Sequence, residues 1–185
     1  EYQELGTFVT GPYEPTLTRQ RGSVAVALAR EGTVTIAGRP LLLRVEKQLA
    51  ASRRAPELTV SYRLHNPGNE RLAVRFGVET VWAVTDPASQ IRIDERSVPA
   101  RELVMAPQAR VVRFTDWGWP GAVSLRLPPG EVWVHPLETV SNSEAGFERI
   151  FQGVVCLCLW DVILQPQESW EAVLHCALGE GISSG

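Results

Sequence analysis

The chain has 185 residues, which is long enough for one domain with a hydrophobic core of its own. Its formal net charge is −3, and arginines such as Arg71 and Arg92 are interspersed with acidic residues, which argues against a nucleic acid or an acidic membrane as partner. No apolar run approaches the ~20 residues that a membrane-spanning helix needs. We therefore expect no nucleic acid and no membrane as partner.

Apolar and polar residues alternate along most of the chain, which is typical of β-strands with one buried face. The first runs of this kind, at 23–29 and 33–36, flank a predicted tight turn at Arg30-Glu31-Gly32. The clearest runs are 57–65 and 71–82, which we expect to pair as a hairpin around Pro67-Gly68. The remaining expected strands are 41–49, 91–93, 98–104, 110–114, 122–127, 132–137, 154–164 and 169–178, and the early prolines Pro12 and Pro15 are assigned to a loop.

No window carries the periodicity of an amphipathic helix. At most, residues 140–148 form one helical turn, since Ser141 and Glu144 have the spacing of a capping box. About a dozen short strands with Gly and Pro turns predict an all-β fold, a large antiparallel two-sheet β-sandwich. We expect a single domain over residues 1–180, excised from a longer polypeptide, with 181–185 as a flexible tail.

The three cysteines are too few for a disulfide framework in a domain of this size. Cys156 and Cys158 lie in an apolar run and are expected to be buried structural thiols. A metal site would also need Cys176 or His175, and the paired spacings of zinc sites are absent. Unpaired thiols fit a reducing compartment, so we expect a cytoplasmic protein with no metal and no cofactor.

The segment 135–153 is the most polar part of the last third of the chain. Because it lies between two apolar runs, it is either a solvated connection or a functional site. Its candidate contact residues are Glu138, Asn142, Glu144, Glu148 and Arg149.

Six tryptophans form a second feature. Trp82, Trp160 and Trp170 fall on or near apolar faces and are assigned to the core. Trp117 and Trp119 stand in a turn-rich segment beside Asp116, where flat aromatic rings would either stack on sugar rings or pack against a neighbouring domain.

The motifs of common active sites are missing: there is no P-loop, GxGxxG, HExxH or GxSxG. Glycoside hydrolysis needs two carboxylates across a sugar-sized gap. Carboxylates are available, as in any domain of this size, but none is flanked by the strand-end arrangement of an enzyme barrel. The three histidines show no triad pattern. We therefore expect no catalytic residue in this chain.

The segment HPLETVSNSEAGFERIFQG, followed by Trp160-Asp161 and by Pro166-Gln167-Glu168-Ser169-Trp170, resembles the C-terminal region of glycoside hydrolase family 57 enzymes. Two earlier motifs are similar too: Glu4-Leu5-Gly6-Thr7-Phe8 and Phe76-Gly77-Val78-Glu79. These enzymes are α-amylases and 4-α-glucanotransferases that act on α-glucans.

The resemblance implies a β-sandwich similar in fold to galactose mutarotase. It also implies that catalysis belongs to an N-terminal barrel of the same polypeptide, which this domain supports, and that the domain could contact α-glucan. Two alternatives stay open. One is a mutarotase-like epimerase that uses His135 or His175 with a carboxylate, and the other is a purely structural interaction module.

Overall fold

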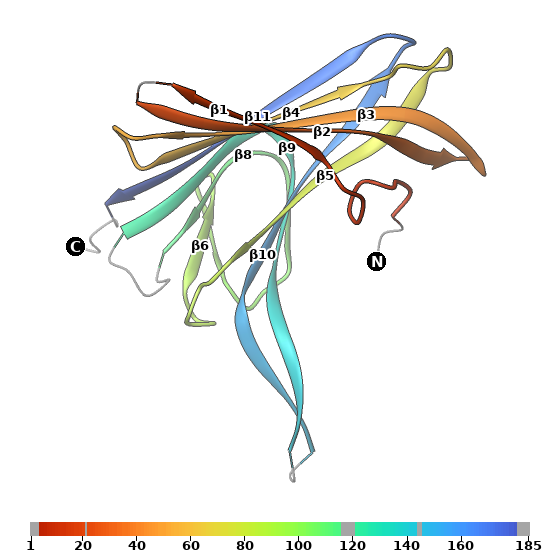
Figure 1. Cartoon of the computed structure of the whole chain (residues 1–185). Helices are drawn as coiled ribbons and strands as arrows, with labels where there is room; N and C mark the ends of the chain where they lie inside the picture. The colour runs from red at the N-terminus through yellow and green to blue at the C-terminus, as the bar shows by residue number, and fades with distance from the viewer. Residues whose placement is uncertain (1–3, 21, 116–120, 144–145, 181–185) are drawn as a thin grey trace. The chain divides into compact units, whose positions relative to one another are not determined.

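The computed structural model describes residues 4–20, 22–115, 121–143 and 146–180. These residues contain eleven β-strands and no helix, and the paired strands are antiparallel (Figure 1). The all-β, antiparallel prediction is confirmed. The described residues include no helix that is long and apolar enough to cross a membrane.

The chain divides into two compact units. Unit 1 comprises residues 1–75 and 161–174, and unit 2 comprises residues 76–160 and 175–185. The chain passes from one unit to the other within three strands, which are β5 (Leu72–Trp82), β10 (Gly146–Leu164) and β11 (Ser169–Glu180).

Unit 1 contains a sheet in the order β1-β2-β3-β4-β11. Its first four strands are β1 (Glu14–Gln20), β2 (Ser23–Ile36), β3 (Arg39–Ser52) and β4 (Glu57–His65). Buried residues on one face of this sheet form its core: Val34, Leu43, Val45, Tyr62 and Leu64.

Two predictions about β1 and β2 are wrong. Residues 30–32 are not a turn, because β2 runs without interruption through them. Gly32 is there for close packing: a Cβ atom would lie 2.7 Å from Thr7 Oγ1 and 3.0 Å from the Phe8 ring. The turn lies instead at Ala37 and Gly38, whose φ values of 50° and 77° fit a two-residue hairpin loop. Pro15 lies in β1, an edge strand, where proline is tolerated because no ladder hydrogen bond is lost.

Both strands of the expected 57–82 hairpin exist, the first with the predicted bounds and the second beginning one residue later than predicted, but they do not pair with each other. β4 lies between β3 and β11, and β5 pairs with β10. The connection after β4 is held by Asn66, which is 1% exposed. Its Nδ2 donates to the carbonyls of Glu70 at 2.7 Å and Gln165 at 3.1 Å, and its Oδ1 accepts from the Gly68 amide at 3.0 Å. Asn66 therefore fastens this turn to the β10–β11 turn.

Unit 2 contains the order β11-β9-β8-β6-β7, with β10 also paired to β9. These strands are β6 (Gln90–Ile93), β7 (Arg96–Pro99), β8 (Val104–Phe114) and the long β9 (Gly121–Ser143). The expected strands 122–127 and 132–137 are both parts of β9, which continues through Pro128-Pro129-Gly130. The register of β8 against β9 shifts on both sides of the Ala109–Gly130 pair, so irregular pairing accommodates the two prolines.

The core of unit 2 is built around β10. Residues 153–160 are all buried, which confirms the prediction of a strand buried on both faces. Trp160 is buried, stacks on Phe76 with centroids 6.3 Å apart and donates from Nε1 to the Pro128 carbonyl at 3.4 Å. Trp82 stacks on Phe114 at 4.6 Å, and Trp82 and Trp170 are half-buried.

We expect Asn66→Ala to lower the free energy of unfolding by about 1–3 kcal/mol, because it leaves carbonyls and an amide of two turns without their partner. Chemical denaturation followed by circular dichroism measures the loss. Asn69→Ala is the matched control, since Asn69 is an exposed residue of the same turn. Equal loss of stability in both variants would contradict the role given to Asn66.

Candidate functional site

A β-hairpin that we call the arm lies at the far ends of β9 and β10. It comprises residues 137–143 and 146–153, paired in the register Gly146–Ser143 to Gly153–Leu137 with a bulge between Phe151 and Gly153. Figure 1 shows the arm extending beyond β6 and β8 of unit 2. The expected helical turn at 140–148 is wrong, since residues 140–143 and 146–148 are strand.

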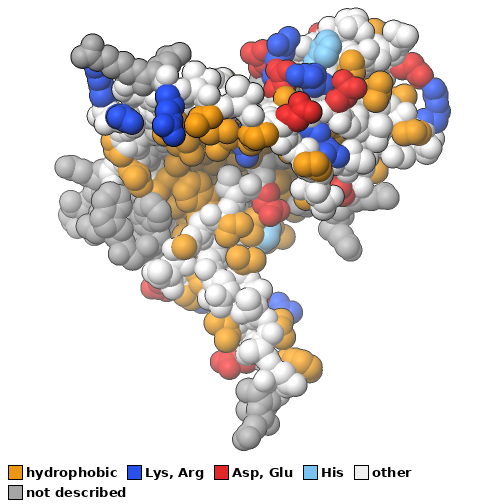
Figure 2. Space-filling view, viewed as in Figure 1, with side chains coloured by type: hydrophobic (Ala, Val, Ile, Leu, Met, Phe, Trp, Pro, Cys, Tyr) orange, Lys and Arg blue, Asp and Glu red, His pale blue; other side chains and the backbone are white. Residues whose placement is uncertain are grey.

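The arm exposes apolar side chains along its length. Phe147 is 83% exposed, Val140 is 64% exposed and Ile150 is 42% exposed. Figure 2 shows apolar side chains on the arm interspersed with charged ones. A lone two-stranded ribbon has no core of its own to hide such residues, and exposed apolar groups that gather on one element are typical of an interaction surface. Phe147, Val140 and Ile150 were not singled out from the sequence.

The polar residues that the sequence singled out lie on both faces of the arm. Arg149 and Glu138 come together, with Nη1 and Oε2 at 3.3 Å. Asn142 pairs with Phe147 on that same face, whereas Glu148 pairs with Ser141 on the opposite one. The arm therefore does not bring two free carboxylates together. An exposed ion pair of this kind contributes little stability, but it helps to fix the hairpin register.

Four of the predicted contact residues, Asp116, Trp117, Trp119 and Glu144, lie outside the described residues, as does the expected tail 181–185. Their role as sugar or interdomain contacts stays a prediction.

Cys156 and Cys158 are fully buried, as the sequence predicts, and no cysteine is paired. The side-chain hydrogen bond to Cys158 and burial raise the pKa of the Cys156 thiol well above its ordinary value. Burial also raises the pKa of Cys176, which is half-buried. The described residues hold no group of three or more His, Cys, Asp or Glu side chains that could bind a metal ion.

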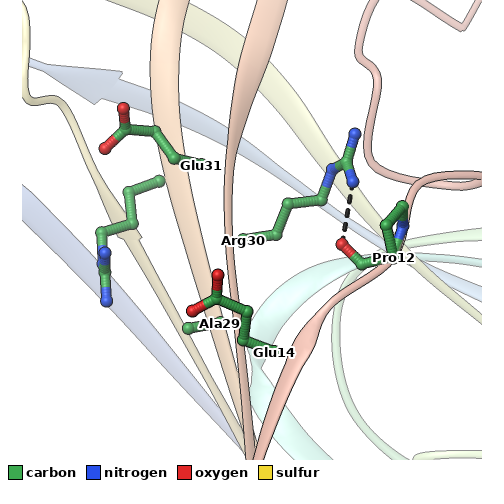
Figure 3. Close-up of a pocket in the computed structure, with 6 residues that line it drawn as sticks. Pro12, Glu14, Ala29, Arg30 and Glu31 are labelled. Carbon is green, nitrogen blue, oxygen red and sulfur yellow. Dashed lines mark hydrogen bonds between the residues drawn. The ribbon is translucent and has the colours of Figure 1, made fainter.

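Two surface cavities lie among the described residues of unit 1. One, of about 300 Å³, is lined by Pro12, Glu14, Ala29, Arg30, Glu31 and Arg44 (Figure 3). The other, of about 420 Å³, is lined by parts of β2, β3 and β4 and by Glu171. Neither is lined by a histidine. His135 Nδ1 lies instead 3.1 Å from the Pro136 carbonyl oxygen, and His175 lies in β11 opposite Arg126.

The fold is shared with sugar-related proteins of low sequence identity. A candidate aldose 1-epimerase of Escherichia coli K12 superposes with a TM-score of 0.68 at 14% identity, over 92% of this chain and 69% of that one. A galactose mutarotase-like protein of Lactobacillus casei gives a TM-score of 0.55 at 11% identity, over 90% of this chain and 73% of that one. The chain is therefore an all-β domain of the galactose mutarotase-like fold, as the sequence predicts.

Residues 1–174 match the family model described as alpha-amylase/4-alpha-glucanotransferase, C-terminal. The chain belongs to this family. The 4-alpha-glucanotransferase of Thermococcus litoralis superposes with a TM-score of 0.70 at 28% identity, over 95% of this chain. This chain spans only 24% of the length of that enzyme. No curated protein sequence matches the chain.

Thiol reactivity should separate the cysteines. We expect a disulfide reagent at neutral pH to label Cys176 slowly and to leave Cys156 and Cys158 unlabelled until the chain unfolds. Burial withholds access to Cys156 and Cys158, and it raises the pKa of Cys156 and Cys176. Timed labelling followed by peptide mass spectrometry measures the order. Rapid labelling of Cys156 in the folded chain would contradict the buried strand.

Proposed function

We propose that the chain is the non-catalytic C-terminal domain of an α-glucan-active enzyme of glycoside hydrolase family 57, an α-amylase or a 4-α-glucanotransferase of the cytoplasm. The family match and the enzyme of Thermococcus litoralis support an assignment to this group of enzymes. The polypeptide then carries its catalytic barrel elsewhere, in line with the 24% of that relative that this chain spans. Three unpaired cysteines fit a reducing compartment.

The arm is the surface that contacts the catalytic barrel in this proposal. The observation that carries it is the 83% exposure of Phe147, which the described residues of unit 2 leave uncovered. A large aromatic side chain kept in water on a projecting ribbon gains free energy when a second surface covers it. Glu138 and Arg149 beside it suit the polar rim of such a contact.

The epimerase alternative gains no support from the described residues. His135 lies in β9 and pairs with Val155 of β10, whereas His175 lies in β11 and pairs with Arg126 of β9. The likeness to an aldose 1-epimerase, at 14% identity, concerns the fold alone.

Phe147→Asp in the full-length polypeptide should loosen the domain contact, because it places a charge where an apolar surface is buried. We expect faster limited proteolysis between the barrel and this domain and a loss of thermal stability of the barrel. Ile163→Asp is the matched control, since Ile163 is 55% exposed at the other end of the same strand. Equal behaviour of the two variants would contradict the assignment of the arm.

A second part of the proposal is contact with α-glucan through Trp117 and Trp119. Trp117→Ala/Trp119→Ala in the full-length enzyme should weaken binding of amylopectin by about thirtyfold, because each of the two stacking rings contributes ~1 kcal/mol. Retardation in native gels that contain amylopectin measures the change. Trp133→Ala is not a suitable control, because the Trp133 indole donates to Glu131 at 2.6 Å. Leu17→Ala, at an exposed position of β1, serves instead. Unchanged retardation of the double variant would remove glucan contact from these two residues.

A further inference from the structure

The outer face of the unit 2 sheet carries a patch of arginines. Arg92 in β6, Arg113 in β8 and Arg126 in β9 each lie between two buried residues of the same strand, so all three side chains point away from the core. The three strands are neighbours, since β8 pairs with both β6 and β9. We call these arginines, together with Ser124 of β9, the basic face; all four residues belong to unit 2.

The strand register places two positive charges opposite each other on the basic face. Arg92 is the direct cross-strand partner of Arg113. Directly opposite residues have Cβ atoms about 5 Å apart, and like charges in this position destabilise a sheet. Both side chains are half-buried, so water and salt screen their repulsion less than at a fully exposed position. An anion bound between the two guanidinium groups would remove this repulsion.

The described residues place few carboxylates beside Arg92. Its Nη2 lies 3.5 Å from Oε2 of Glu95, and the Glu95 side chain is 98% exposed. An ion pair this exposed is weak, so an anion can replace Glu95 at little cost. Asp94 is already occupied, because its Oδ1 accepts from the amides of Arg110 at 3.1 Å and Val111 at 2.9 Å.

The other donors of the basic face are free. Within the described part of the chain, Arg113 and Arg126 form no ion pair. Ser124 lies directly opposite Arg113 and is half-buried, and its hydroxyl group has no hydrogen-bond partner among the same residues. Arg126 is diagonal to Arg113, since its direct partner is Val111, so its charge reaches the same place from about 7–8 Å.

These donors fit a tetrahedral oxyanion better than a planar carboxylate. Each guanidinium group offers parallel N–H donors that bind two oxygen atoms, and Ser124 adds a hydroxyl donor from the neighbouring strand. A carboxylate has two oxygen atoms to accept these bonds, whereas a phosphate group has at least three. A phosphate monoester carries about −1.5 to −2 charges at pH 7, which balances the two opposed arginines.

We propose that the basic face binds a phosphate group, free or as a phosphate monoester, between Arg92 and Arg113. Ser124 donates a further hydrogen bond, and Arg126 attracts the anion. The site is separate from the arm and takes no part in bond cleavage. It does not depend on the function proposed above, because it rests on the strand register and charges of unit 2 alone.

Isothermal titration calorimetry of the full-length polypeptide with inorganic phosphate tests the proposal. Chloride holds the ionic strength constant, so that general screening does not change. We expect a Kd of about 1 mM, and Arg113→Gln should weaken binding by about tenfold through the loss of charge-assisted hydrogen bonds. Arg101→Gln is the matched control and should bind like the wild type, since it removes the same charge from an exposed turn of unit 2.

Amide hydrogen exchange separates ligand binding from a structural role of Arg113. At a phosphate concentration about ten times the Kd, exchange in β6 and β8 of the wild type should slow by about tenfold. Exchange in Arg113→Gln should not respond at that concentration to the same degree. In chloride alone, Arg113→Gln should exchange as slowly as the wild type or more slowly, because the variant no longer repels Arg92.

Glycerol 3-phosphate then distinguishes the two sources of the phosphate group. Binding at least as tight as that of inorganic phosphate indicates a monoester as the ligand, and weaker binding indicates free phosphate. The proposal is overturned if the wild type binds neither compound, or if Arg113→Gln and Arg101→Gln bind phosphate equally. Faster exchange of β6 and β8 in Arg113→Gln without phosphate would also overturn it, because Arg113 would then stabilise the sheet itself.

Discussion

The arm depends on a close approach between Gly153 and the backbone of Trp82. A Cβ atom at residue 153 would collide with the Trp82 carbonyl oxygen, so only glycine fits there without displacing β5. Gly153 is also the boundary between two parts of β10: residues 153–160 are buried, whereas 146–150 and Gln152 are exposed. The bulge beside Gly153 interrupts the register at the same point. One glycine therefore separates the strand that forms the core from the strand that forms the arm.

This division explains how a single hairpin serves two purposes. The buried part of β10 provides Cys156, Leu157 and Cys158 to the core of unit 2, which anchors the hairpin. Beyond Gly153 the same two strands continue their pairing but gain no further burial, so Val140, Phe147 and Ile150 stay in contact with water. Covering these side chains would recover free energy that the domain alone cannot obtain. The proposed contact with a catalytic barrel follows from this difference in burial between the two parts of the hairpin.

The sequence predicted which residues form strands better than it predicted how the strands pair. Period-two alternation located β4 and β5 correctly because it reports which face is buried. The predicted pairing of β4 with β5 was wrong, because alternation contains no information about which strands lie side by side. The side chain of Asn66 is hydrogen-bonded to a turn about a hundred residues away, and this contact holds β11 beside β4. Gly32 and Pro128 are residue types typical of turns, but both lie inside strands. Gly32 packs closely against Thr7, and irregular pairing with β8 accommodates Pro128.

For the candidate site, residue type was a partial guide. Glu138, Asn142, Glu148 and Arg149 do lie on one exposed element, as their polar composition indicates. The apolar residues between them could not be assigned from alternation, because an exposed ribbon and a half-buried strand show the same pattern. The cavity beside Arg30 could not be predicted from the sequence, because it lies where pairing along the edge of β2 is interrupted.

Hydroxyl-radical footprinting of the intact polypeptide tests the central claim most directly, because it reads the exposure of Phe147 without any substitution. The account predicts that Phe147 is oxidised far more slowly than its intrinsic reactivity allows, although it is 83% exposed in this domain. Met105, which is 50% exposed on β8, provides an internal reference. Oxidation of Phe147 at the rate of a fully accessible phenylalanine would show that nothing covers the arm and would contradict the account.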